Sequence, residues 1–149
     1  IIKGKLIERM KMRKIYIAGP LFNAHERDYL EKIALELENN GYECFLPHRD
    51  QTGIPDDQIA QHTMTQKTRN KIFNNDLNAL EASDITVALL TGQDIDSGTS
   101  AEIGFTYANK KPVIAIKAAE TRLRNLFVEG MISITIDDID QLVGAISKV

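Results

Sequence analysis

Two carboxylates, Asp96 and Glu102, stand on either side of a short glycine-bearing segment and follow closely on an apolar run, residues 84–90. The run has the composition of a buried strand, and ligands of open α/β sheets bind at the carboxyl ends of such strands. Paired carboxylates are suited to general acid–base catalysis. We therefore take Asp96 and Glu102 as the first candidates for chemistry.

A structural interpretation of Glu102 also fits the spacing. Thr99 and Glu102 are placed as in a capping box, where the two side chains satisfy the first backbone donors of a helix. Against this, Asp94 and Asp96 make the preceding loop richer in acid than a helix cap requires. The backbone around Gly98 is also a candidate anion site, because helix starts attract negative charge.

Asp76 lies in a segment that is poorly suited to a purely structural helix, because Asn74, Asn75 and Asn78 surround it. Asp and Asn have low helix propensity, and functional sites are where such local rules are broken. We expect Asp76, near the end of a long helix, to face the same crevice as the two acids above. Asp84, at the other end of the predicted strand, is interpreted as a turn or strand-start residue.

Strand and helix signals alternate along the chain, which is the pattern of a parallel sheet covered on both faces. The expected strands are residues 15–18, 42–46, 84–90, 112–117 and 132–136. The expected helices are residues 24–40, 56–82 with one break near 61–65, 99–109, 120–129 and 138–148. We predict an α/β fold: a flavodoxin-like doubly wound five-stranded parallel sheet with helices on both faces.

In this fold the first and third strands lie side by side, so their carboxyl ends meet at one crevice. Gly19, after the first strand, would then lie beside the loop 91–98 and the helix that carries Glu102. We expect Glu102 in the first turn of that helix. Asn23 is the expected cap of the first helix and Gly41 its stop.

The chain has 149 residues, of which 43% are hydrophobic, and this suits one domain with a single core. We assign residues 12–149 to this domain and treat residues 1–11 as an N-terminal extension or an expression remnant. A formal net charge of -3 gives no basic surface for nucleic acid. No apolar run approaches the roughly 20 residues that span a bilayer, so we expect no membrane partner.

Cys44 is the single cysteine, so we expect a buried thiol in a reducing, cytoplasmic setting. His25, His48 and His62 lack the spacing of metal ligands. The turn after the first strand lacks the glycine motifs of dinucleotide and triphosphate sites. We therefore expect neither a metal nor an organic cofactor.

Four segments taken together, residues 15–22, 74–78, 96–108 and 125–127, resemble the nucleoside 2-deoxyribosyltransferase family. Each motif is weak alone, but their order and spacing make the set specific. The likeness extends from Arg13 to the last expected helix. It implies an enzyme that moves 2-deoxyribose between nucleobases, with small-molecule deoxynucleosides and free nucleobases as substrates.

The resemblance also implies a role for three residues near the reacting carbon. In the family, the glutamate in the position of Glu102 is the nucleophile that attacks C1′ of the deoxyribose and forms a covalent glycosyl enzyme. Tyr16 matches a tyrosine that orients this glutamate, and Asp76 matches an acid that exchanges a proton with the base. These roles agree with general chemistry, because a carboxylate stabilises oxocarbenium character at C1′ and then bonds to the carbon.

Three further positions are implied to contact the substrate. Asp96 matches an acid that holds sugar hydroxyls, and Gln51 stands where a base-contacting glutamine is expected. Asn125 matches an asparagine that a neighbouring subunit contributes to the sugar. A complete site would therefore imply a homo-oligomer.

A related branch hydrolyses 2′-deoxynucleoside 5′-phosphates and holds the phosphate with serines and an arginine near the first-strand loop. In this chain residues 19–23 contain neither residue type, Asn125 stands where that branch has serine, and Asp96 would repel a phosphate. Transfer between nucleosides is therefore favoured. The alternatives are an N-glycosidase of this branch, with water as acceptor, and a non-catalytic nucleotide-binding module.

Overall fold

A computed structural model describes residues 12–58, 62–92, 94–117 and 125–149. The extension assigned to residues 1–11 and the first part of the helix expected at 120–129 lie outside these ranges. The strands are β1 (Lys14–Ala18), β2 (Glu43–Phe45), β3 (Ile85–Leu90), β4 (Val113–Lys117) and β5 (Ile134–Ile136). The helices are α1 (Ala24–Asn39), α2 (Gln66–Ala82), α3 (Ser97–Ala108), α4 (Leu126–Glu129) and α5 (Leu142–Ile146), with short 3-10 turns at Asp56–Gln58 and Ile139–Gln141.

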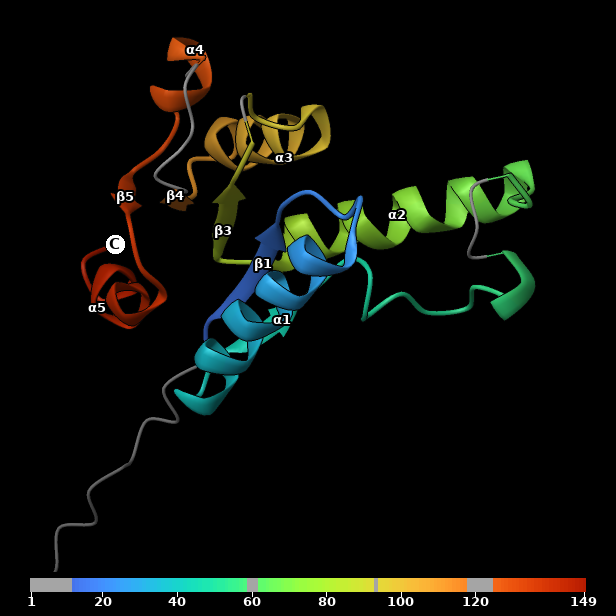
Figure 1. Cartoon of the computed structure of the whole chain (residues 1–149), viewed down its shortest axis with the longest axis horizontal. Coiled ribbons are helices and arrows are strands. Elements are labelled where there is room, and N and C mark those ends of the chain that lie inside the picture. The colour runs from blue at the N-terminus through green and yellow to red at the C-terminus, as the bar shows by residue number, and fades with distance from the viewer. Residues whose placement is uncertain (1–11, 59–61, 93, 118–124) are drawn as a thin grey trace, which may run out of the picture.

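The strands form one sheet in the order β2-β1-β3-β4-β5, and every neighbouring pair is parallel. Figure 1 shows β5, β4, β3 and β1 succeeding one another across the sheet. This order confirms the predicted α/β fold. It places β1 beside β3, so the carboxyl ends of these two strands lie side by side, where α/β sheets bind ligands.

The sheet separates two apolar cores, and β1 contributes to both because successive side chains of a strand point to opposite faces. Ile15 and Ile17 pack with apolar residues of α1 and α5. Tyr16 and Ala18 pack on the other face, with residues of α2, α3 and α4. The side chain of Tyr16 therefore lies on the same side of the sheet as the two helices that carry the candidate acids.

The structure confirms the cap and the stop predicted for the first helix. The side chain of Asn23 accepts from the backbone nitrogen of Glu26 at 2.9 Å, and the Glu26 carboxylate accepts in return from the Asn23 backbone. Gly41 follows the helix at a φ of +85°, which a glycine adopts without strain. Within the described ranges, no helix is both long and apolar enough to cross a membrane.

Candidate active site

The hydroxyl of Tyr16 and the carboxylate of Glu102 are in direct contact. Tyr16 lies on β1, and α3, which follows β3 in the chain, packs against both strands. The Tyr16 hydroxyl donates a hydrogen bond of 2.7 Å to Oε1 of Glu102. This bond fixes one oxygen of the carboxylate, and none of the described residues donates to the other oxygen, Oε2.

The start of α3 differs from the capping box that was the alternative interpretation of Thr99 and Glu102. The helix begins at Ser97, and its cap is Asp96, whose Oδ2 accepts from the Thr99 backbone at 3.0 Å. Glu102 lies in the second turn, so the expected first-turn position is wrong, and its side chain contacts Tyr16 rather than the helix start. Asp is among the strongest cap residues, and Asp96 therefore starts the helix earlier than Thr99 would.

The Tyr16 ring is held in surroundings that keep its hydroxyl protonated and able to donate. It is fully buried and stacks on Phe45 of β2, with ring centroids 5.6 Å apart. Burial, with the nearby carboxylates of Glu102 and Asp76, raises the pKa of Tyr16 far above its ordinary value. The phenol therefore stays protonated and donates to the Glu102 carboxylate.

Burial also changes the ionisation of Glu102. It raises the pKa of this carboxyl to about 7, although the hydrogen bond from Tyr16 acts in the opposite direction. The negative charges of Asp76 and Asp96 raise the pKa further. Glu102 therefore changes protonation state near neutral pH, which is unusual for a carboxyl group and typical of catalytic acids and bases.

Asp76 is the second acid of the site, and it is paired with Gln51. The amide nitrogen Nε2 of Gln51 donates to Oδ1 of Asp76 at 2.7 Å, across the gap between α2 and the loop after β2. Burial raises the pKa of Asp76 to about 6, and the bond from Gln51 opposes this shift. Two acids with raised pKa values therefore lie close enough to influence each other's charge.

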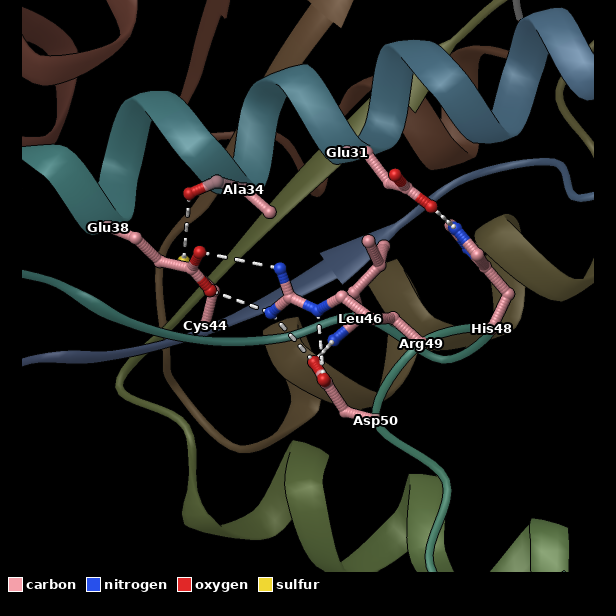
Figure 2. Close-up of polar contacts among 8 residues, drawn as sticks. All are labelled: Glu31, Ala34, Glu38, Cys44, Leu46, His48, Arg49 and Asp50. Atoms are coloured by element: carbon pink, nitrogen blue, oxygen red, sulfur yellow. Dashed lines mark hydrogen bonds and ion pairs between the residues drawn. The ribbon is translucent and has the colours of Figure 1, made fainter.

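Charged side chains attach the loop after β2 to α1, as Figure 2 shows. Arg49 donates to Oε1 of Glu38 at 2.6 Å and to Oδ1 of Asp50 at 2.9 Å. The Nε2 atom of His48 lies 2.9 Å from Oε1 of Glu31. These contacts fix the backbone immediately before the glutamine that pairs with the second acid.

Cys44 lies beside this network, with its sulfur 3.9 Å from the carbonyl oxygen of Ala34 (Figure 2). Burial raises the pKa of the Cys44 thiol to about 12. The thiol is therefore protonated at neutral pH, which gives it little nucleophilic character. No cluster of three His, Cys, Asp or Glu side chains able to hold a metal is present in the part of the chain that the structure describes.

Asn75 is a polar residue whose contacts the sequence did not indicate. Its Nδ2 atom donates to Oε1 of Gln51 at 2.9 Å and to the backbone oxygen of Thr52 at 3.0 Å. The asparagines around Asp76 were unusual for a helix, but spacing alone did not distinguish Asn75 from the exposed Asn74. The distinguishing feature is a contact between positions more than twenty residues apart.

Close packing explains why two of the predicted site positions, Gly19 and Gly98, are glycines. A Cβ atom on Gly98 would lie 3.1 Å from Oδ2 of Asp96, so glycine keeps the space beside that carboxylate open. A Cβ atom on Gly19 would lie 2.6 Å from Cδ2 of Leu30 and 3.2 Å from Cβ of Leu89. Gly19 therefore lets the end of β1 pack closely against α1 and β3.

Asn125 has a local role within its own chain. Its Oδ1 atom accepts from the backbone nitrogens of Phe127 at 3.0 Å and Val128 at 3.3 Å, and so caps α4. The side chain is exposed, and its Nδ2 group points to no partner in the described residues. The structure therefore brings together Tyr16 with Glu102 and Gln51 with Asp76, whereas Asn125 contacts none of them.

Comparisons with known proteins agree on one family. The family model described as nucleoside 2-deoxyribosyltransferase matches residues 15–143. A nucleoside deoxyribosyltransferase of Limosilactobacillus fermentum is 29% identical over 107 residues, which cover 69% of this chain but only 64% of that relative's length.

Two solved structures share the fold. A conserved protein from Enterococcus faecalis V583 matches with a TM-score of 0.76 at 26% identity, over 92% of this chain and 98% of that one. A 2-deoxyribosyltransferase from Bacillus psychrosaccharolyticus matches with a TM-score of 0.73 at 24% identity, over 87% of this chain and 89% of that one. The second likeness is evidence for the fold alone.

Proposed function

We propose that this chain, which belongs to the nucleoside 2-deoxyribosyltransferase family, transfers a 2-deoxyribosyl group between nucleobases through a covalent intermediate on Glu102. The observation that carries the proposal is the 2.7 Å hydrogen bond from Tyr16 to Oε1 of Glu102. A carboxylate in a helix cap would be occupied by backbone donors. This one is instead oriented by a buried phenol, with its other oxygen available.

In the first half-reaction, Oε2 of Glu102 attacks C1′ of the bound deoxynucleoside. The C1′–N bond breaks, its electron pair stays with the departing base, and an ester bond to Glu102 forms. The absence of a 2′-hydroxyl makes positive charge at C1′ easier to form, and the carboxylate below the ring stabilises that charge. An incoming base then attacks C1′ and releases the carboxylate.

Asp76 supplies the proton that the departing base needs and takes one back from the incoming base. Its pKa of about 6 and that of Glu102, about 7, lie close together, so the two groups share one proton between these values. The reactive form carries this proton on Asp76 and the negative charge on Glu102. The bond from Tyr16 favours that form, because it stabilises the ionised state of Glu102.

The remaining site residues hold the substrate in this proposal. Asp96 accepts hydrogen bonds from the sugar hydroxyls through Oδ1, since Oδ2 caps α3, and Gly98 leaves room beside it. Gln51 contacts the base, and the backbone at Gly19 borders the crevice. No metal or organic cofactor takes part in these steps.

Asn125 completes the site of a neighbouring copy, which makes the active protein a homo-oligomer. Its capping role uses only Oδ1, so the Nδ2 group remains available to donate to a sugar. The two residues that follow are large and apolar, with Leu126 81% and Phe127 79% exposed. Burying them against a second copy would remove this apolar surface from water and carry Asn125 to that copy.

The experiment is to incubate the chain with one deoxynucleoside and a different free base, and to separate the products by chromatography. The proposal predicts a new deoxynucleoside that contains the added base. Release of the original base without an acceptor, faster with a 5′-phosphate on the substrate, would instead support the N-glycosidase. A ligand-induced rise in melting temperature with no product would support a non-catalytic binding module.

A further inference from the structure

A chain of hydrogen bonds links α2 to the loop after β2. Asn75 uses its Nδ2 atom twice, to the backbone oxygen of Thr52 at 3.0 Å and to Oε1 of Gln51 at 2.9 Å. Gln51 in turn donates through Nε2 to Oδ1 of Asp76 at 2.7 Å. A residue with no direct contact to the second acid is thus connected to it through the Gln51 amide.

The side-chain amides of Asn75 and Gln51 have one favourable orientation in this series of hydrogen bonds, and the backbone carbonyl of Thr52 determines it. A backbone carbonyl oxygen only accepts, so the Asn75 amide must turn its nitrogen toward Thr52. Both hydrogens of that nitrogen are then in use, and the second one requires an oxygen on Gln51. Reversing the Gln51 amide would place two donors together at Asn75 and two acceptors together at the ionised Asp76.

We propose, as an extension of the function proposed above, that Asn75 is a positioning residue: held by the Thr52 carbonyl, it fixes the direction of the Gln51 amide and leaves Oδ2 of Asp76 as the oxygen that exchanges a proton with the nucleobase. Oδ1 is occupied as an acceptor, so a proton bound there would displace the Gln51 bond. Among the described residues, none donates to Oδ2.

The proton transfer follows from this assignment. As the C1′–N bond breaks, the O–H bond at Oδ2 breaks too, the proton bonds to the departing base, and Asp76 is left as a carboxylate. The incoming base returns a proton to the same oxygen. Throughout the cycle Oδ1 continues to accept from Gln51, so the acid keeps its orientation.

The same direction determines what Gln51 offers to a base. Its amide keeps one free N–H and one free lone pair, because one of each is already used. A carboxamide with one donor and one acceptor complements the paired donor and acceptor on a nucleobase edge. Asn75 therefore fixes the order in which this pair is presented to the base.

The experiment compares Asn75→Leu with Asn74→Leu, an exposed neighbour on the same helix. Leucine keeps the approximate size and removes the donors, and its higher helix propensity raises helix stability in both variants alike. The apparent pKa of Asp76 is followed by carbon NMR, with Tyr16 and Glu102 as the titratable groups that face it in the described structure. The proposal predicts a rise above the native value for Asn75→Leu, because the Gln51 donor is no longer fixed, and no change for Asn74→Leu.

Base exchange gives the second readout. Asn75→Leu should lower kcat by up to about tenfold, as expected for one hydrogen bond. In a Gln51→Ala background the same substitution should have no further effect, because Asn75 acts through Gln51. Additive losses, or an unchanged Asp76 titration in a folded Asn75→Leu protein, would overturn the proposal; Asn75→Ala replaces the variant if leucine prevents folding.

The two proposals fail in different ways. The titration of Asp76 needs no substrate. If the native protein is inactive but Asn75→Leu still raises the pKa of Asp76, the transferase function is contradicted and the fixed orientation of the Gln51 amide is supported. An active native protein with no Asn75 effect would contradict the positioning role alone.

Discussion

Tyr16 and Glu102 lie 86 positions apart in the sequence and share a hydrogen bond of 2.7 Å, in which the phenol donates to the carboxylate. The bond exists because β1 and β3 are neighbours in the sheet and α3 returns over β1. It orients a carboxyl group whose pKa is raised to about 7, mainly by burial. Tyr16→Phe should therefore test the relationship directly.

We expect Tyr16→Phe to slow base exchange roughly tenfold to hundredfold, because a charge-assisted donor to the proposed nucleophile is lost. The stack on Phe45 keeps the ring in place, so the fold should survive. The limb of the rate profile that requires ionised Glu102 should move to higher pH. Tyr42→Phe, at a half-buried tyrosine outside the site, is the control, and equal rates for the two variants would contradict the orienting role.

The rate of base exchange should depend on pH with a single maximum between about 6 and about 7, the pKa values of Asp76 and Glu102. Below this range both acids are protonated, so Glu102 cannot attack, and above it both are ionised, so Asp76 has no proton to give. The measurement is kcat/KM against pH. A rate that stays constant from about pH 5 to about pH 9 would be incompatible with both roles.

Glu102→Gln should stabilise the fold at high pH. The pKa of Glu102 is raised from 4.5 to about 7, so the native state binds the proton more tightly than the unfolded state. The contribution of the native carboxyl is complete below about pH 4.5 and is lost as the pH rises through about 7. The Gln side chain of Glu102→Gln does not titrate, so this variant keeps its stability as the pH rises.

Urea unfolding measures the difference. From about pH 4.5 to about pH 8, Glu102→Gln should gain on the order of 1–3 kcal/mol in free energy of unfolding relative to the native chain. Glu81→Gln, at an exposed residue near the end of α2, should follow the native curve. A constant difference between Glu102→Gln and the native chain across this range would contradict the raised pKa.

Asn125→Asp separates the capping role of Asn125 from its proposed role in a neighbouring site. Aspartate keeps an oxygen for the α4 cap and removes the Nδ2 donor, so the variant should fold but exchange bases slowly. Co-expression with Glu102→Ala should restore activity, since mixed assemblies contain some sites with both native residues. Two inactive partners that stay inactive in a mixed oligomer, or a monomeric native chain, would contradict the shared site.

The parallel sheet and its two-sided cover followed from the alternation of strand and helix signals, because buried parallel strands need apolar runs and crossover helices. The strand order came from the choice of a flavodoxin-like arrangement. The exact start of α3 could not be predicted from the sequence, since the spacing of Thr99 and Glu102 also fits a capping box. In the structure the helix begins earlier, because Asp96 caps it with its own carboxylate. Sequence spacing identifies both possibilities but does not choose between them.

The family resemblance implied separate roles for Gln51 and Asp76 but not the hydrogen bond between them, and the contribution of Asn75 was missed. Both depend on how the loop after β2 meets α2, and that loop carries no periodic pattern that would place it. Gly19 shows a similar limit. Its closeness to Leu30 and Leu89 arises from packing between three elements, which the local sequence does not encode.

Mass spectrometry of the intact protein after rapid acid quenching tests the central claim most directly. A native chain mixed with a deoxynucleoside, with no acceptor base, should gain the mass of one deoxyribosyl group, and peptide mapping should place it on Glu102. The Glu102→Ala variant should gain nothing and lose about a thousandfold or more in base exchange. A native chain that turns over without the adduct, or an adduct that persists in Glu102→Ala, would contradict Glu102 as the nucleophile.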